Sequence, residues 1–133
     1  MEDSRGKFIV IGAGYASKVD KFFLSNQGLK SRFTSTLIFE DYTVTDLMAM
    51  YSSIADKEYT TSPDAMLKIQ LVLTTHKASS GDSFGNAREV RRLFESIKEN
   101  VATRVMADFR NQTIIADRET HLRTILPCDV ISL

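Results

Sequence analysis

Only two segments of this chain have the sequence pattern of β-strands, and both lie in its first forty residues. Residues 8–11 form the apolar run Phe-Ile-Val-Ile, closed by glycines, which is typical of a strand covered on both faces of a sheet. Residues 34–40, Thr-Ser-Thr-Leu-Ile-Phe-Glu, predict a second strand. Two strands do not make a stable sheet by themselves. The pattern therefore predicts the end of a larger α/β domain.

The remainder of the chain has the pattern of helices with defined starts. Thr43 followed by Asp46 has the spacing of a capping box. Ser62 in the N-cap position, followed by Pro63 at the first helical position, is a second start signal. Apolar residues recur at helical spacing behind both starts. These signals predict one helix from residue 43 and another from residue 62.

The longest predicted helix runs from Asn86 to about Phe109. Asn86 and Glu89 repeat the capping pattern, with Asn86 as the N-cap. One apolar face follows: Val90, Leu93, Phe94, Ile97, Val101 and Val105. A short helix is predicted over residues 118–125. The predicted fold class is thus mixed α/β and mainly α, with a small helical bundle behind the strands.

The composition excludes several classes of protein. Lysine plus arginine equals aspartate plus glutamate, 17 each, which argues against a protein that coats a polyanion, so no nucleic-acid partner is expected. No apolar run approaches the roughly 18 residues that cross a bilayer, so no membrane partner is expected. The single cysteine, Cys128, excludes an internal disulfide and favours a reducing, cytoplasmic location. Cys128, His76 and His121 are scattered, so no metal ligand is predicted.

Arg88 falls in the first turn of the long predicted helix, where the helix dipole disfavours a cation. One explanation is a surface arginine offset by a local carboxylate such as Glu89 or Asp82, since such pairs are common and weak. The other is a bound anion. A helix N-terminus favours phosphate, and an arginine beside it adds bidentate donors. On helix physics alone the first explanation is the commoner one.

Arg32 lies on a short connector between Gly28 and the second predicted strand. An arginine on such a connector is well placed to reach a neighbouring molecule. Supplied in trans to a transferring phosphoryl group, it stabilises the developing charge strongly. A solvated or ion-paired arginine is the plainer alternative.

Five motifs occur in a fixed order along the chain. They are Ala13-Gly14-Tyr15; the pair Phe22 and Phe23; Asn26, Gly28, Leu29, Ser31, Arg32 and Phe33; Phe39, Asp41 and Tyr42; and Gly85, Asn86, Arg88, Val90 and Arg91. Together they resemble the C-terminal half of an AAA+ ATPase module, in the branch with red-type rubisco activases, stage V sporulation protein K and type VII secretion ATPases. Gln27 stands where that branch usually has proline.

The resemblance implies roles for particular residues. Arg32 corresponds to the arginine finger, which contacts the nucleotide of the adjacent subunit. Arg88 corresponds to the sensor 2 arginine, which contacts the γ-phosphate of its own subunit's nucleotide from the lid, with Gly85 and Asn86 beside it. No sensor 1 residue is assigned.

The resemblance also implies a domain organisation and an assembly. Residues 1–40 would be the C-terminal end of the nucleotide-binding α/β core, and residues 41–133 the helical lid. The complete module would use ATP and Mg²⁺ and would assemble with itself into a ring, expected to be a hexamer, that remodels protein substrates.

The sequence departs from a complete module in one important respect. It contains no G-x-x-x-x-G-K-[ST] phosphate loop and no strand that ends in paired acids to hold Mg²⁺. We therefore expect an ATPase parent and a chain that by itself neither hydrolyses ATP nor binds nucleotide tightly. The alternative is a stand-alone helical module that serves protein interaction or regulation without catalysis.

Overall fold

The structure, a computed structural model, describes residues 9–25, 27–111 and 117–131. The chain divides into two compact units, Met1–Glu40 and Asp41–Leu133, which we call unit 1 and unit 2.

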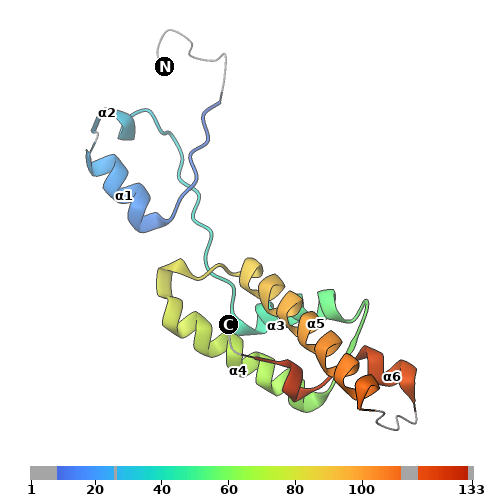
Figure 1. Cartoon of the computed structure of the whole chain (residues 1–133). Coiled ribbons are helices and arrows are strands. Elements are labelled where there is room, and N and C mark those ends of the chain that lie inside the picture. Colours follow the sequence, from blue (N-terminus) through green and yellow to red (C-terminus); the bar gives the residue numbers. More distant parts are fainter. Residues whose placement is uncertain (1–8, 26, 112–116, 132–133) are drawn as a thin grey trace. The chain divides into compact units, whose positions relative to one another are not determined.

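Unit 1 contains two helices, α1 (Ala16–Ser25) and α2 (Gln27–Lys30), which are labelled in Figure 1. The two predicted strands do not form: within the described residues, 9–14 and 34–40 have no strand pairing. Their apolar side chains are accordingly exposed, with Ile9 at 88% and Phe39 at 89%. A strand requires hydrogen bonds to a neighbouring strand, and these segments do not pair with each other.

An aromatic contact organises the described part of unit 1. The rings of Phe23 in α1 and Phe33, which follows α2, meet edge to face with their centroids 5.3 Å apart. Gly12 lies against the ring of Phe33, where an added Cβ would stand 3.7 Å from the nearest ring atom. These contacts link Gly12, in the first extended segment, and Phe33, just before the second, to α1.

Unit 2 is a helical bundle, and it holds the hydrophobic core. Its helices are α3 (Val44–Ala55), α4 (Pro63–Ser80), α5 (Ala87–Arg110) and α6 (Arg118–Arg123), with short 3₁₀ turns η2 (Gly81–Ser83) and η3 (Pro127–Asp129). Helix α3 packs against both the long α5 and α4, and Figure 1 shows α6 near the end of α5 where that helix finishes. The core consists of Leu47, Tyr51, Ala55, Ala65, Ile69, Leu73, Phe84, Val90, Leu93, Phe94, Ile97, Val101, Val105, Ile125 and Val130.

The starts of α3 and α4 confirm the predicted caps. The Thr43 hydroxyl accepts from the Asp46 backbone N–H at 3.2 Å, and an Asp46 carboxylate oxygen accepts from the Thr43 backbone N–H at 3.0 Å. The Ser62 hydroxyl accepts from the Ala65 backbone N–H at 3.3 Å, with Pro63 at the first helical position. Each cap satisfies backbone donors that a helix start otherwise leaves without a partner.

The start of α5 corrects a prediction. Asn86 is the N-cap residue, yet in the described structure its side chain makes no capping hydrogen bond, and Glu89 does not complete a capping box. The amide of Asn86 is bonded elsewhere, and the Glu89 carboxylate is buried against α4. Long-range contacts therefore override the local capping chemistry at this helix.

A small parallel sheet was not predicted. Strand β1 (Thr60–Thr61) pairs with β2 (Thr124–Ile125), so that Thr60 faces Thr124. The Ser62 backbone N–H extends the pairing to the Ile125 carbonyl at 3.0 Å. Two-residue strands carry no periodic signal, and the sequence pattern places residues 124–125 at the end of a predicted helix, whereas α6 ends at Arg123.

A buried ion pair fixes the C-terminal segment to α5. The Arg104 guanidinium donates to both carboxylate oxygens of Asp129, from Nε at 2.9 Å and from an Nη atom at 3.1 Å. It also donates to the Thr124 carbonyl at 2.8 Å. The Asp129 side chain is only 2% exposed, so this fork-to-fork contact lies in a weakly screened environment.

Candidate anion site at the start of α5

Arg88 occupies the second position of α5, as the sequence predicted. Its side chain is exposed, and within the described residues its guanidinium makes no hydrogen bond or ion pair. The explanation that a local carboxylate offsets Arg88 is therefore not what the structure shows. The arginine stands at the positive end of a 24-residue helix and has no ion-pair partner among the described residues.

Glu89 is the acidic residue in the first turn of α5, but its carboxylate is paired with residues other than Arg88. It accepts from the Arg92 guanidinium at 3.0 Å and lies 3.5 Å from His76 Nε2 on α4. The residue is 7% exposed. Gly85 makes room for this arrangement, since a Cβ there would stand 2.6 Å from a Glu89 carboxylate oxygen.

Backbone amides at this helix start are mostly occupied by a tight turn. The N–H of Arg88 donates to the Gly85 carbonyl at 3.0 Å, and the N–H of Glu89 donates to the Asn86 carbonyl at 3.0 Å. An anion at this end would thus find its main donors on the Arg88 side chain rather than on the backbone. Arg91, one position beyond the first turn, is also exposed.

Asn86 has an unusual backbone and a fully used side chain. Its φ of 51° lies in the region that favours glycine, and Asn is one of the few other residues that adopt it. Its Oδ1 accepts from the Tyr42 backbone N–H at 3.1 Å, and its Nδ2 donates to the Asp41 carboxylate at 2.7 Å. The Lys77 ammonium of α4 donates to the Tyr42 carbonyl.

Arg32 belongs to unit 1 and lies two residues after the end of α2. Its side chain is exposed, and its backbone N–H donates to the Leu29 carbonyl at 3.0 Å. Arg88 is in unit 2, so the predicted site residues fall in two separate units. Gly85, Asn86 and Arg88 are brought together in one turn.

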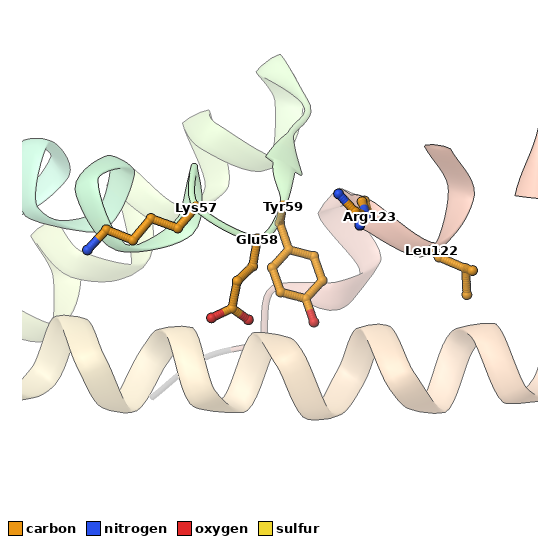
Figure 2. A pocket seen from close by; sticks show the side chains of 5 residues that line it. All are labelled: Lys57, Glu58, Tyr59, Leu122 and Arg123. Carbon is orange, nitrogen blue, oxygen red and sulfur yellow. The ribbon is translucent and has the colours of Figure 1, made fainter. Parts of the chain in front are cut away.

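A shallow cavity of about 310 Å³ lies elsewhere in unit 2. It is lined by Lys57, Glu58, Tyr59, Leu122 and Arg123, none of which the sequence had singled out. Figure 2 shows Glu58 and Tyr59 pointing toward the long helix that crosses the view, and Lys57 and Leu122 pointing away on opposite sides. The cationic and apolar side chains do not converge on one point, so this surface has no evident chemistry.

Two further observations bear on the kind of site. No group of three or more His, Cys, Asp or Glu side chains in the described ranges is arranged to hold a metal ion. Among the helices described here, none combines the length and the apolar character that crossing a bilayer requires.

Comparison with known proteins identifies unit 2. Residues 43–132 match the family model described as the AAA lid domain. The chain belongs to the AAA+ ATPase family. Its sequence corresponds to the C-terminal portion of such an ATPase, with the helical lid following the end of an α/β core.

Individual relatives agree with this assignment. The chain is 39% identical to stage V sporulation protein K of Bacillus subtilis over 81% of its length and 34% of the relative's. It is 34% identical to the ESX-3 secretion system protein EccA3 of Mycolicibacterium smegmatis over 98% of this chain and 23% of that protein. It is 32% identical to the chloroplastic ribulose bisphosphate carboxylase/oxygenase activase of Cyanidioschyzon merolae over 80% of this chain and 36% of the activase. The AAA+ chain thus spans about a third or less of these relatives.

Proposed function

We propose that the lid carried by this chain senses ATP through Arg88. The observation that supports this role is the exposed guanidinium at the second position of α5, which makes no ion pair among the described residues. A cation there is unfavourable unless an anion shares the site, and a γ-phosphate is such an anion. Gly85 and Asn86 would shape the turn that presents Arg88, rather than contact the nucleotide with their own side chains.

In the complete protein, Arg32 would serve as the arginine finger toward a neighbouring subunit. The module would then work as a homo-oligomeric ring, a hexamer in our proposal, which hydrolyses ATP with Mg²⁺ to remodel proteins in a chaperone-like manner. The phosphate loop and the Mg²⁺-binding acids are not present in this sequence. Arg32 and Arg88 would contribute only charge stabilisation and positioning. The cytoplasmic location expected from the single cysteine remains a prediction.

Titration of this chain with Mg-ATP and with tripolyphosphate, followed by NMR, tests the role of Arg88. We expect millimolar affinity with shifts confined to the first turn of α5, and loss of most of that binding in Arg88→Ala. Arg91→Ala is the matched control, because it removes the same charge just beyond the first turn. Equal loss in both variants would mean that only net charge matters, and no loss in either would refute the sensor role.

The role of Arg32 requires the complete ring. Arg32→Ala in the full-length ATPase should retain nucleotide binding but lower kcat by about 10³-fold or more. Mixing this variant with a second variant that lacks the phosphate-loop lysine should restore some hydrolysis, since each would supply what the other lacks across a subunit boundary. No recovery in mixed rings would count against action in trans.

The stand-alone interaction module is retained as a second candidate because the sequence lacks a phosphate loop. Micromolar binding of Mg-ATP to this chain, abolished by Arg88→Ala, would favour it. The lid would then form a usable phosphate site without a nucleotide-binding core.

A further inference from the structure

The side chain of Asn86 joins two parts of unit 2 that are more than forty residues apart. It bonds the backbone N–H of Tyr42 at 3.1 Å and the carboxylate of Asp41 at 2.7 Å. Asp41 and Tyr42 are the first residues of unit 2, where the chain arrives from unit 1. Asn86 itself is the N-cap of α5, two residues before Arg88.

The backbone of Asn86 is held in a conformation that costs free energy. A non-glycine residue at a φ of 51° persists only when surrounding contacts determine it. Here those contacts include the two amide bonds to Asp41 and Tyr42, and the bonds that the Asn86 carbonyl accepts from the backbone N–H groups of Glu89 and Val90. In the described structure the side chain makes no capping bond to α5. The path of the chain into Arg88 therefore depends on residues at the entry to unit 2.

Residues 41–43, where the chain enters unit 2, also include hydrogen-bond partners of α3 and α4. Lys77 near the end of α4 donates to the Tyr42 carbonyl. Thr43, the next residue, is bonded to Asp46 in the capping box of α3. Asp41 and Tyr42 thus lie among bonds from α3 and α4, and among the hydrogen bonds of the described residues it is the Asn86 side chain that connects them to the start of α5.

We infer that Asn86 is a positioning residue that couples anion binding at Arg88 to the entry of the chain into unit 2. Any adjustment of the first turn of α5 around an anion changes the geometry of Asn86, and with it the bonds to Asp41 and Tyr42. This inference rests on the proposed function of Arg88. It adds a defined connection between the sensing residue and the junction of the two units.

The Tyr42 amide provides a direct measurement, because its N–H is the donor to Asn86. Hydrogen exchange of this amide, resolved by NMR in the full chain, reports how often the bond opens. Coupling between sites commonly changes such equilibria by about 5- to 150-fold. We expect saturating tripolyphosphate to slow exchange at Tyr42 by about fivefold, and to leave it unchanged in Asn86→Gly and in Arg88→Ala.

Coupling must also act in the reverse direction. Asn86→Gly keeps the positive φ without strain but removes both bonds, so it should weaken tripolyphosphate binding by the same factor. Asn111→Gly, the same substitution at the other end of α5, should leave the affinity and the Tyr42 exchange rate unchanged. Glycine also loses conformational entropy on folding, so thermal unfolding of both variants is measured to confirm that the fold is retained.

A reciprocal exchange of side chains tests the bond itself. Asn86→Asp places a carboxylate against Asp41 and should speed exchange at Tyr42. Adding Asp41→Asn restores a hydrogen bond in which position 41 donates and position 86 accepts. The double variant should therefore restore protection of the Tyr42 amide from exchange. Failure of the double variant to recover would overturn the inference.

The remaining outcomes separate the two proposals. Arg88-dependent binding with no change at Tyr42 would overturn the coupling and leave the sensor role intact. If tripolyphosphate binding did not depend on Arg88, the sensor role would fail and the coupling with it. Weaker binding in Asn86→Gly that persists equally in an Arg88→Ala background would show that Asn86 acts independently of Arg88, which also refutes the coupling.

Discussion

At the scale of single residues, the start of α5 contains a residue that lowers the stability of the helix. Arg88 opposes the helix dipole and has no compensating partner in the described structure, while the adjacent Glu89 is directed into a buried contact with Arg92 and His76. Proteins break such local rules mainly at functional sites.

Arg88→Gln should therefore stabilise the protein. Removing the cation from the first turn is expected to raise the free energy of unfolding by about 0.3–1 kcal/mol at low salt. Urea denaturation at low and at high ionic strength measures this, and the gain should shrink in high salt because the interaction is screened. Arg91→Gln, outside the first turn, should show little gain. A clear loss of stability in Arg88→Gln would mean that the arginine has a structural role.

Gly85→Ala should destabilise unit 2 by about 1–3 kcal/mol. The new methyl group would meet Glu89 Oε1 at 2.6 Å and Glu89 Cγ at 3.2 Å, and the buried carboxylate must move away from His76 and Arg92. Thermal or urea unfolding measures the loss. In a Glu89→Ala background the added methyl should cost much less, and an undiminished cost would place its origin elsewhere.

Sequence reasoning found Arg88 because a charge at a helix start conflicts with a local rule. It did not find the roles of Asn86 and Glu89, because their spacing in the sequence matches a capping box. Their actual partners, Asp41, Tyr42 and His76, come from other elements. No local sequence signal distinguishes a capping residue from one that bonds to a residue distant in the sequence.

At the scale of elements, helix starts were predictable and strands were not. Thr43 and Ser62 cap their helices as expected because capping is decided within four residues. The segments 9–14 and 34–40 have apolar strand patterns, but a strand needs a partner to pair with. Conversely, β1 and β2 pair although neither has a pattern of its own.

The capping box of α3 gives a pH dependence with a defined sign. Hydrogen bonds from the Thr43 hydroxyl and then from its backbone N–H lower the pKa of Asp46 below its usual value. The folded state therefore gains stability from ionised Asp46 above the unfolded pKa near 4, and this gain is lost as the pH falls through the lower folded pKa. In Asp46→Asn the deficit in urea midpoint relative to the parent chain should be largest near neutral pH and should shrink below about pH 4. A deficit that is constant with pH would contradict this account.

The buried pair of Arg104 and Asp129 should be costly to break. Asp129→Ala leaves a guanidinium without its counter-ion in a buried site and is expected to destabilise unit 2 by about 3–5 kcal/mol. Glu95→Ala, which removes an exposed pair with Lys98 on the same helix, should cost less than about 1 kcal/mol. Urea unfolding of the two variants makes the comparison, and similar losses would refute a special role for the buried pair.

At the scale of the molecule, the two units differ in how they are stabilised. All residues of the hydrophobic core belong to unit 2, while none of the described residues 9–25 and 27–40 with an assigned exposure is buried. Burial of apolar surface is the main stabilising term in folding. Unit 2 therefore accounts for the cooperative stability of the chain.

Residues 41–133 expressed alone should be at least as stable as the whole chain. Unit 1 exposes apolar segments without strand partners, and such edges favour association. Urea midpoints of the short and full chains, with light scattering to detect association, test this expectation. A clearly lower midpoint for the short chain would show that unit 1 contributes to the stability of unit 2.

The pairing of β1 with β2 has a consequence for synthesis. Thr60 pairs with Thr124, and the Lys68 ammonium of α4 donates to the Pro127 carbonyl at 2.9 Å. Neither contact can form before the C-terminal residues of the lid have been synthesised. Chains fold from the N-terminus as they leave the ribosome, yet this lid cannot close its core until Val130 has been added. On a translating ribosome, α3 and α4 must therefore persist as an unfinished intermediate with an open core. During that interval the apolar faces of α3 and α4 lack part of the surface that covers them in the finished lid.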